Sequence, residues 1–247
     1  MKTLCAANLA WVAAALMLLG GICTLSGILT ESEVTHRGLG RIEVLEYGNH
    51  TQLANLWEGR RAARPYLLFG DFLWAFGWLL LITPIQTLAT LLGGEQRSGT
   101  TMLRVCFLAP AILSIVDFTF QAGTVSVSDR VSEAPLFDTS ASVVGALTPL
   151  QSLELSYRIA RARSMWLSAL TDGCVCLGFA AAAFLAHDRR HIDLSMGFKV
   201  LTIINMMVAF GGTLSGIVRG ADFGELRNLA KPVNGLWFLS LCVALCF

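Results

Sequence analysis

The feature that most constrains this chain is a series of long apolar segments. The first extends from Thr3 to Thr30 without a charged residue. A helix needs about 20 apolar residues to cross the roughly 30 Å hydrocarbon core of a bilayer. A soluble core does not require uncharged segments of this length. Only 14% of the 247 residues are charged, against about 25% in a typical soluble domain. The sequence therefore predicts an integral membrane protein.

Six segments are long and apolar enough, or nearly so, to cross a membrane. Lipid offers the backbone no hydrogen bonds, so a spanning segment is a helix or part of a closed barrel. The alternating pattern of barrel strands is missing here. We predict an all-α, multi-pass membrane protein in which residues 1–247 form one domain with about six transmembrane helices; five is the alternative count, because the last segment is short. The predicted spans are residues 4–29, 66–92, 105–127, 165–186, 200–218 and 232–247.

Two long connections between these spans are expected to contain helix of their own. In Asn49–Arg61, leucines, Trp57 and Arg60 recur at helical spacing with an aromatic and basic edge. That pattern is typical of an amphipathic helix in the headgroup layer, with Trp57 as its interfacial anchor. Ahead of the fourth span, Pro149 and Gln151 suit the first turn of a helix. We therefore expect an interfacial helix in the first long connection and a fourth helix that extends several turns beyond the membrane.

Two opposing signals leave the orientation open. Of the 18 arginines and lysines, twelve lie in or beside the first, third and fifth connections. The positive-inside rule places that face in the cytoplasm or its organellar equivalent. A possible glycosylation site, Asn49 in Asn49-His50-Thr51, lies on the same face and is usable only if that face is lumenal. We give the arginine count more weight. Which membrane holds the protein does not follow from the sequence.

Three aspartates lie inside predicted spans. Asp71, Asp117 and Asp172 each occur in an apolar segment, where a charge costs about 2.5–3.5 kcal/mol even on the lenient insertion scale. Counting residues to the flanking polar segments places all three roughly 10 to 18 Å from the face that carries the long connections. Such residues normally face the protein interior and mark ion or proton pathways. The three acids are therefore the candidate functional residues.

Two arrangements of these acids are possible. In the first, they form a polar cluster with Gln121 and Thr119 that passes a proton or holds a cation. In the second, each acid is satisfied separately, by an arginine such as Arg64, Arg163 or Arg219 or by a neighbouring helix. Spacing alone leaves both open, because it encodes neither helix rotation nor the order of neighbours.

Small residues indicate close helix packing. The pentapeptide TLSGI occurs at Thr24–Ile28 and again at Thr213–Ile217, each time shortly after a Gly-Gly pair. The second copy overlaps a GxxxG spacing, which lets two membrane helices approach closely. The predicted packing residues are Gly20, Gly27, Gly212 and Gly216.

No catalytic motif is evident. The sequence contains no G-x-S-x-G, no glycine-rich phosphate loop and no paired CxxC. His187 and His191 have i, i+4 spacing, but no third metal ligand is placed near them. The net charge of +1 provides no basic footprint for nucleic acid. We expect neither enzymatic activity nor a cofactor, a metal or a nucleic-acid partner.

Two functions fit these expectations. The first, slightly favoured, is a non-enzymatic structural or accessory subunit of a larger membrane assembly. The missing catalytic motifs, the small-residue faces and a last span short enough to need a partner all support it. The second is a small proton- or cation-coupled transporter or channel that uses the intramembrane carboxylates. The expected partners are the lipid bilayer and either other membrane subunits or further copies of the chain.

Overall fold

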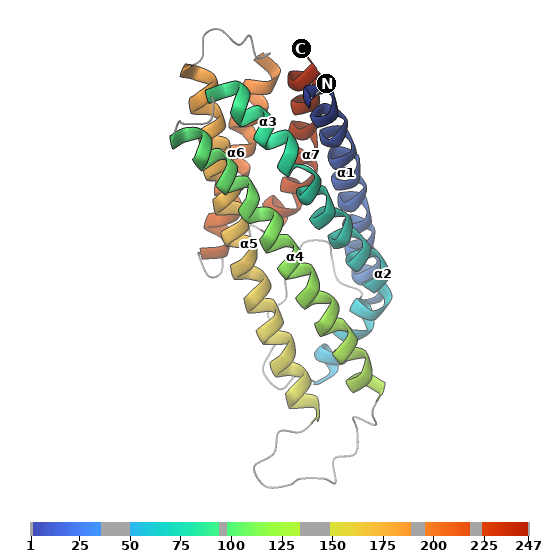
Figure 1. Ribbon diagram of the computed structural model, residues 1–247. Helices are drawn as coiled ribbons and strands as arrows, with labels where there is room; N and C mark the ends of the chain where they lie inside the picture. The colour runs from blue at the N-terminus through green and yellow to red at the C-terminus, as the bar shows by residue number, and fades with distance from the viewer. Residues whose placement is uncertain are drawn as a thin grey trace.

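The computed structural model describes residues 2–35, 50–93, 98–133, 149–188, 196–217 and 224–246. All of these residues except Leu81 lie in seven α-helices, and no strand occurs among them (Figure 1). The all-α prediction is therefore confirmed for the described part of the chain. The helices are α1 Lys2–Thr35, α2 His50–Leu80, α3 Ile82–Gly93, α4 Ser98–Glu133, α5 Pro149–Asp188, α6 Met196–Ile217 and α7 Gly224–Cys246.

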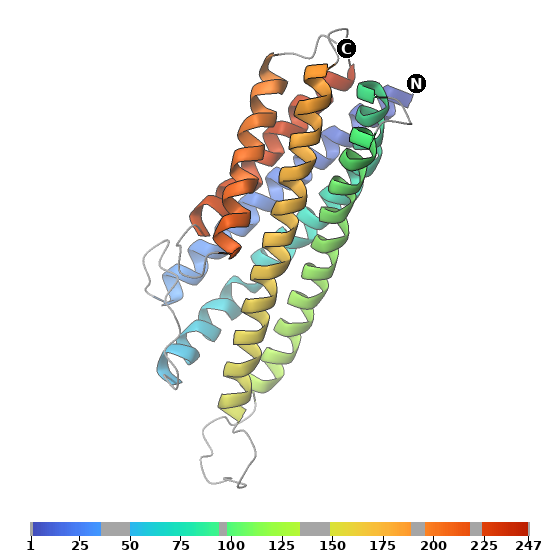
Figure 2. The same cartoon turned by 90° about the vertical axis from the view of Figure 1, so that its left-hand side faces the viewer.

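The helices form one elongated bundle (Figures 1 and 2). α1 packs against α2 and α7, while α5 packs against both α4 and α6. The two ends of the chain lie at the same end of the bundle, which we call the terminal end (Figure 1). At the opposite end, α4 and α5 extend farther than the other helices (Figures 1 and 2).

Five helical stretches are long and apolar enough to cross a membrane, which is compatible with a multi-pass membrane protein. They overlap the first five predicted spans. The sixth prediction corresponds to a shorter apolar stretch within α7, Val233–Leu245. The five long stretches are Leu4–Glu33, Glu58–Leu92, Ser98–Gly123, Trp166–Leu185 and Met196–Leu214.

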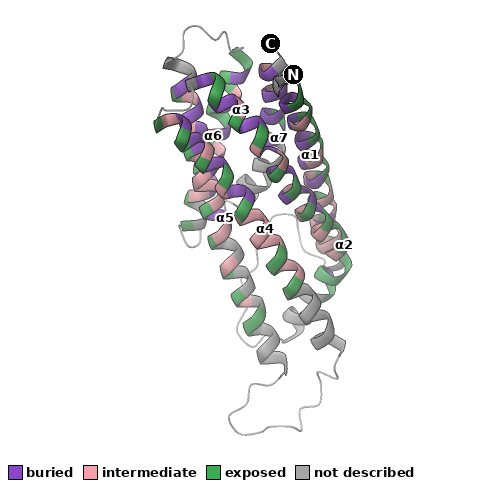
Figure 3. Cartoon of the chain, viewed as in Figure 1, coloured by how far each residue is buried: buried purple, intermediate pink, exposed green. Residues whose placement is uncertain are grey.

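Exposed positions line the outer surface of the bundle (Figure 3), and many of them carry large apolar side chains. Trp11, Phe69, Phe184 and Met207 each expose more than half of their surface. In a soluble protein, apolar exposure on this scale would mark an interaction site or an aggregation hazard. Around a membrane bundle such side chains meet lipid tails instead. On α1 the inward face carries buried alanines together with Met17, and large side chains such as Trp11 and Ile22 point outward, the distribution expected where small residues let helices approach.

Glycines bring α1 and α2 into close contact. A Cβ atom added at Gly20 would lie 2.9 Å from the carbonyl oxygen of Gly70, and one added at Gly27 would lie 2.7 Å from the Leu67 side chain. Because glycine has no Cβ, the two backbones approach closely enough for the dispersion contacts that hold helices together in lipid. The structure thus places Gly20 and Gly27, which the sequence marks as packing residues, at the contact between α1 and α2.

One prolyl residue interrupts the second span. Pro84 has no N–H to donate to the carbonyl of Leu80, four residues earlier, and Leu81 separates α2 from α3. The Ile85 N–H then donates to the Leu81 carbonyl at 2.9 Å, so the helix resumes at once. Pro110 also lies within a span, but it is buried in an uninterrupted α4.

The first long connection differs from the prediction. The expected interfacial helix is not a separate element, because the chain from His50 onward is the first part of α2, which continues to Leu80. Between these ends the helix accommodates Pro65 and three glycines, Gly59, Gly70 and Gly77. The extended fourth helix is present, since α5 is 40 residues long and begins at Pro149. The Trp57 side chain, Asn49, His191 and the surroundings of Gly216 lie outside the described part of the chain.

The centre of the bundle is organised around Trp237 of α7. Its ring centroid lies 4.9 Å from that of Phe179 on α5, 5.4 Å from that of Phe198 on α6 and 5.7 Å from that of Phe107 on α4. Its indole N–H donates to the Thr202 hydroxyl at 2.8 Å. One side chain therefore connects α7 to three other helices through aromatic contacts, which stabilise beyond their buried area.

α2 joins the same cluster. The Trp78 ring lies 5.5 Å from the Phe238 ring in an edge-to-face arrangement. Phe238 and Leu241, like Trp237, are fully buried, so one face of α7 lies in the interior of the bundle. We call the cluster the aromatic core; its members are Trp78, Phe107, Phe179, Phe198, Trp237 and Phe238.

Replacing Trp237 with alanine should lower the free energy of unfolding by about 3–5 kcal/mol, because it empties the centre of the aromatic core. The matched control is Trp11→Ala, which removes a tryptophan that is 61% exposed. Thermal unfolding of both variants in the same detergent measures the difference. Equal losses of stability would contradict the central role of Trp237.

A second pair of variants tests the contact between α1 and α2. A Cβ at Gly70 would lie 2.9 Å from the Gly20 carbonyl oxygen, whereas one at Gly123 would have no atom within 4 Å. Gly70→Ala should therefore destabilise the protein by about 1–3 kcal/mol, and Gly123→Ala should not. The comparison again uses thermal unfolding in detergent, and a neutral Gly70→Ala would overturn the backbone-contact interpretation.

Candidate functional site

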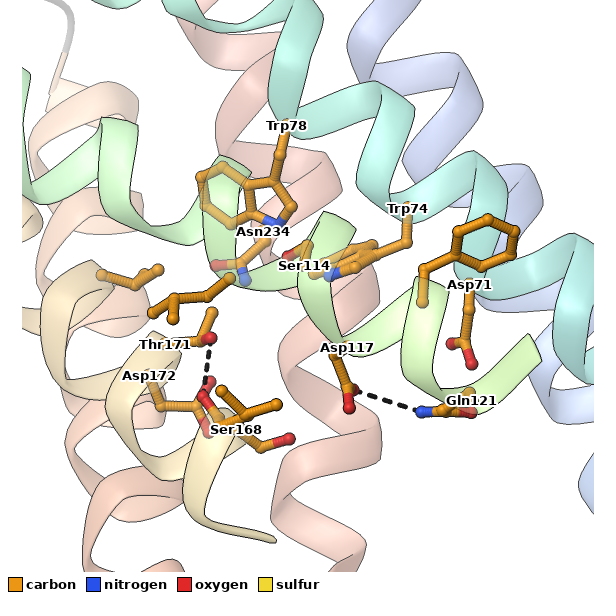
Figure 4. Close-up of a pocket in the computed structure, with 14 residues that line it drawn as sticks. Asp71, Trp74, Trp78, Ser114, Asp117, Gln121, Ser168, Thr171, Asp172 and Asn234 are labelled. Atoms are coloured by element: carbon orange, nitrogen blue, oxygen red, sulfur yellow. Dashed lines mark hydrogen bonds between the residues drawn. The ribbon is translucent and has the colours of Figure 1, made fainter. Parts of the chain in front are cut away.

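A cavity of about 100 Å³ lies among α2, α4, α5 and α7 (Figure 4). This volume is comparable to about three water molecules. All three intramembrane acids line it: Asp71 from α2, Asp117 from α4 and Asp172 from α5. The structure thus places the three acids along one cavity. Each acid also has further polar or electrostatic interactions within the protein.

Each wall of the cavity is one face of a helix. Residues three, four and seven positions apart project from the same side of a helix, and the lining residues follow this spacing. One stripe that contains polar residues, on the apolar part of each of three helices, therefore assembles the cavity. The stripes are Asp71, Trp74 and Trp78 on α2; Ser114, Asp117, Phe118 and Gln121 on α4; and Ser168, Thr171, Asp172 and Val175 on α5.

Gln121 orients the Asp117 carboxylate. Its side-chain amide donates to Asp117 Oδ2 at 3.2 Å, across one turn of α4 (Figure 4). Both side chains are half-buried. Thr119, which the sequence grouped with these residues, is exposed and its hydroxyl donates to the Ile115 carbonyl at 2.8 Å. It therefore lies apart from the cavity.

Asp172 packs against the backbone of α6 at Gly212. A Cβ atom at Gly212 would lie 2.9 Å from Asp172 Cγ and closer still to Oδ2. Only glycine leaves this space, so Gly212 makes room for a carboxylate. The sequence marks Gly212 as a packing residue. In the structure it lets α6 approach α5 at the point where Asp172 points toward the cavity.

Two buried residues on the terminal side of the cavity did not emerge from the sequence. Trp78 is 1% exposed and Asn234 of α7 is 6% exposed. Among the described residues, the Trp78 indole N–H has no hydrogen-bond partner, and Figure 4 shows it turned toward Asn234 and Ser114. Most buried donors are paired, so this group indicates a missing acceptor. The sequence feature that could have identified Asn234 as a site residue is a polar amide side chain within an apolar stretch.

The lining carries three carboxylates and, among the described residues, no arginine, lysine or histidine. Arg163 of α5 lies instead with Cζ 4.4 Å from the centroid of the Phe120 ring, a cation–π contact. The acids do not converge on a point, since no group of three or more His, Cys, Asp or Glu in the described ranges could hold a metal ion. Charge therefore favours a positively charged occupant, and geometry does not favour a metal centre.

The cavity adjoins the aromatic core, and Trp78 belongs to both. Asp117 follows Phe107 by ten residues on α4, and Asp172 precedes Phe179 by seven on α5. At 1.5 Å per residue these separations are about 15 and 10 Å. The acids therefore lie beyond the aromatic core from the terminal end, as the sequence placed them, in one half of the spans.

Comparison with known proteins supplies no family or fold relative. The chain matches no protein-family model, no curated protein and no solved structure. The functional argument therefore rests on the geometry of the cavity.

Proposed function

We propose that the protein is a small membrane transporter or channel for protons or cations, with the carboxylate-lined cavity as its binding site. The observation that carries the proposal is that Asp71, Asp117 and Asp172, from three helices, line one cavity. Asparagine would fill nearly the same space without the cost of a membrane-buried charge, about 2.5–3.5 kcal/mol per residue. A role that needs negative charge accounts for three such residues at one site.

The aromatic core supports a gated site rather than an open pore. Its close-packed rings adjoin the cavity on the side of the terminal end. The acids lie on the opposite side of the cavity, toward the other end of the bundle. We further propose that α7 is a sixth crossing, because an even number of crossings brings both ends of the chain to the same side (Figure 1). Asn234 and Trp237 lie three residues apart on α7. Movement of this helix would therefore change the cavity and the core together.

The first test is the flux of protons and monovalent cations into liposomes that contain the purified protein. Asp117→Asn keeps the side-chain volume and can still accept from Gln121, so we expect a folded protein whose flux falls at least about tenfold. Thr119→Val on the same helix is the control, because Thr119 is exposed and lies apart from the cavity. Unchanged flux in Asp117→Asn would contradict the proposal.

Gly212 offers a test that leaves every acid in place. Gly212→Ala puts a methyl group into the space of the Asp172 carboxylate and should displace it, reducing flux several-fold. Gly173→Ala is the matched control, because a Cβ there would meet Thr213 at an ordinary 3.7 Å. The expected result is impaired flux in the first variant only. Equal flux in both would contradict a role for the position of Asp172.

An accessory role remains the second proposal, and one surface favours it. Leu155 and Ile159, one turn apart on α5, are exposed although they precede the apolar stretch Trp166–Leu185. Apolar side chains outside the lipid-facing stretch suit a protein partner. The short last span also stays compatible with this role, because Leu236 and Val243 of α7 are exposed on the face away from Trp237.

The native mass after mild detergent extraction separates the two proposals. A particle that contains other polypeptides, and loses them in Leu155→Glu, would support the accessory role. A monomer or homo-oligomer with Asp117-dependent flux would support transport.

A further inference from the structure

We propose that the cavity binds a small organic ammonium ion that also carries a hydrogen-bond acceptor, an amino alcohol in chemical class, rather than a bare metal ion. The inference rests on the proposed function, since it takes the carboxylate-lined cavity as the binding site. It adds the chemical class of the bound molecule, which the charge, volume and polarity of the cavity indicate.

The arrangement of the acids disfavours a metal ion. A hard cation such as Ca²⁺ needs six to eight oxygen ligands at about 2.3–2.6 Å. Asp71, Asp117 and Asp172 stand on separate helices, and no group of three His, Cys, Asp or Glu among the described residues could hold a metal ion. A positively charged molecule can instead touch one wall with its ammonium group and another with the rest of its atoms.

The cavity also has two chemically different ends. Toward the aromatic core lie Trp78 and Asn234, and toward the other end lie the acids (Figure 4). The Trp78 indole N–H is a donor only, it is 99% buried, and it lacks a partner among the described residues. An ammonium group cannot satisfy it, because both groups are donors. The occupant therefore presents an acceptor to Trp78 and a cation to the carboxylates.

The size of the cavity also admits such a molecule. A volume of about 100 Å³ has room for ethanolamine, which carries an amine and a hydroxyl on adjacent carbons. The aromatic residues Trp74 and Phe118 in the lining suit an organic cation, which aromatic rings attract when it is desolvated.

The test measures binding to the purified full-length protein in detergent by titration calorimetry. The probes are ethanolamine, ethylamine, which lacks the acceptor, and potassium and calcium chloride. We expect ethanolamine to bind about five- to tenfold more tightly than ethylamine, the usual effect of one hydrogen bond to a buried donor. Asp117→Asn should weaken the binding of both amines.

Trp78→Phe isolates the indole N–H. In this variant ethanolamine and ethylamine should bind with equal affinity, because the donor that distinguishes them is gone; a remaining preference for ethanolamine would contradict the role of the indole N–H. Trp11→Phe, at an exposed position, is the control and should change neither affinity. Equal affinities of the two amines for the unaltered protein, or binding of the metal ions alone, would overturn the inference.

Different experimental outcomes would contradict the inference and the proposed function. Asp117-dependent proton or potassium flux without ethanolamine binding leaves the transport proposal standing and removes the inference, with water as the partner of Trp78. Ethanolamine binding that depends on Trp78, without any flux, leaves the inference standing and removes the transport proposal.

Discussion

The stacking of aromatic rings around Trp237 is the interaction on which the rest of the structure depends. Lipid tails are as apolar as leucine, so burial alone does not drive membrane helices together, and specific packing has to do so. Trp237 contacts rings from α4, α5 and α6 and donates a hydrogen bond to Thr202 of α6. These contacts fix the rotation of each helix about its own axis. Helix rotation in turn decides which polar residues face inward.

The inward position of the acids follows from this helix rotation, because two of them lie seven residues before a ring of the aromatic core. Asp71 precedes Trp78 by seven on α2, and Asp172 precedes Phe179 by seven on α5. Seven residues make nearly two full turns, so each acid lies about 10 Å along the helix on the same face as its aromatic partner. Turning the ring toward the core therefore turns the acid toward the cavity. On α4 the corresponding pair is Phe107 and Ser114, with Asp117 one turn further on.

The sequence predicted the helices, the spans and the shared depth of the acids, because hydropathy and residue counts depend on one helix at a time. It did not predict which faces meet. The seven-residue pairs were present in the sequence, but nothing there marked Trp78 as a wall of the same cavity as Asp117. Gly212 shows the same limit: a missing Cβ makes room for another backbone or for a side chain, and spacing cannot tell which. The length rule alone also could not show that the short apolar stretch of α7 buries one face, with Trp237, Phe238 and Leu241, against the rest of its own chain.

The division of the bundle into an aromatic half and a polar half constrains any transport it performs. Close-packed interiors do not deform continuously; they change between discrete packings. An occupant held by Asp117 and Asp172 could pass the aromatic core only if several of its rings moved together. α7 is the element placed to cause this, because Trp237 forms the core and Asn234 lines the cavity from adjacent turns of that helix. Contact of the occupant with Asn234 would then act on α7, the same helix whose Trp237 forms the centre of the aromatic core.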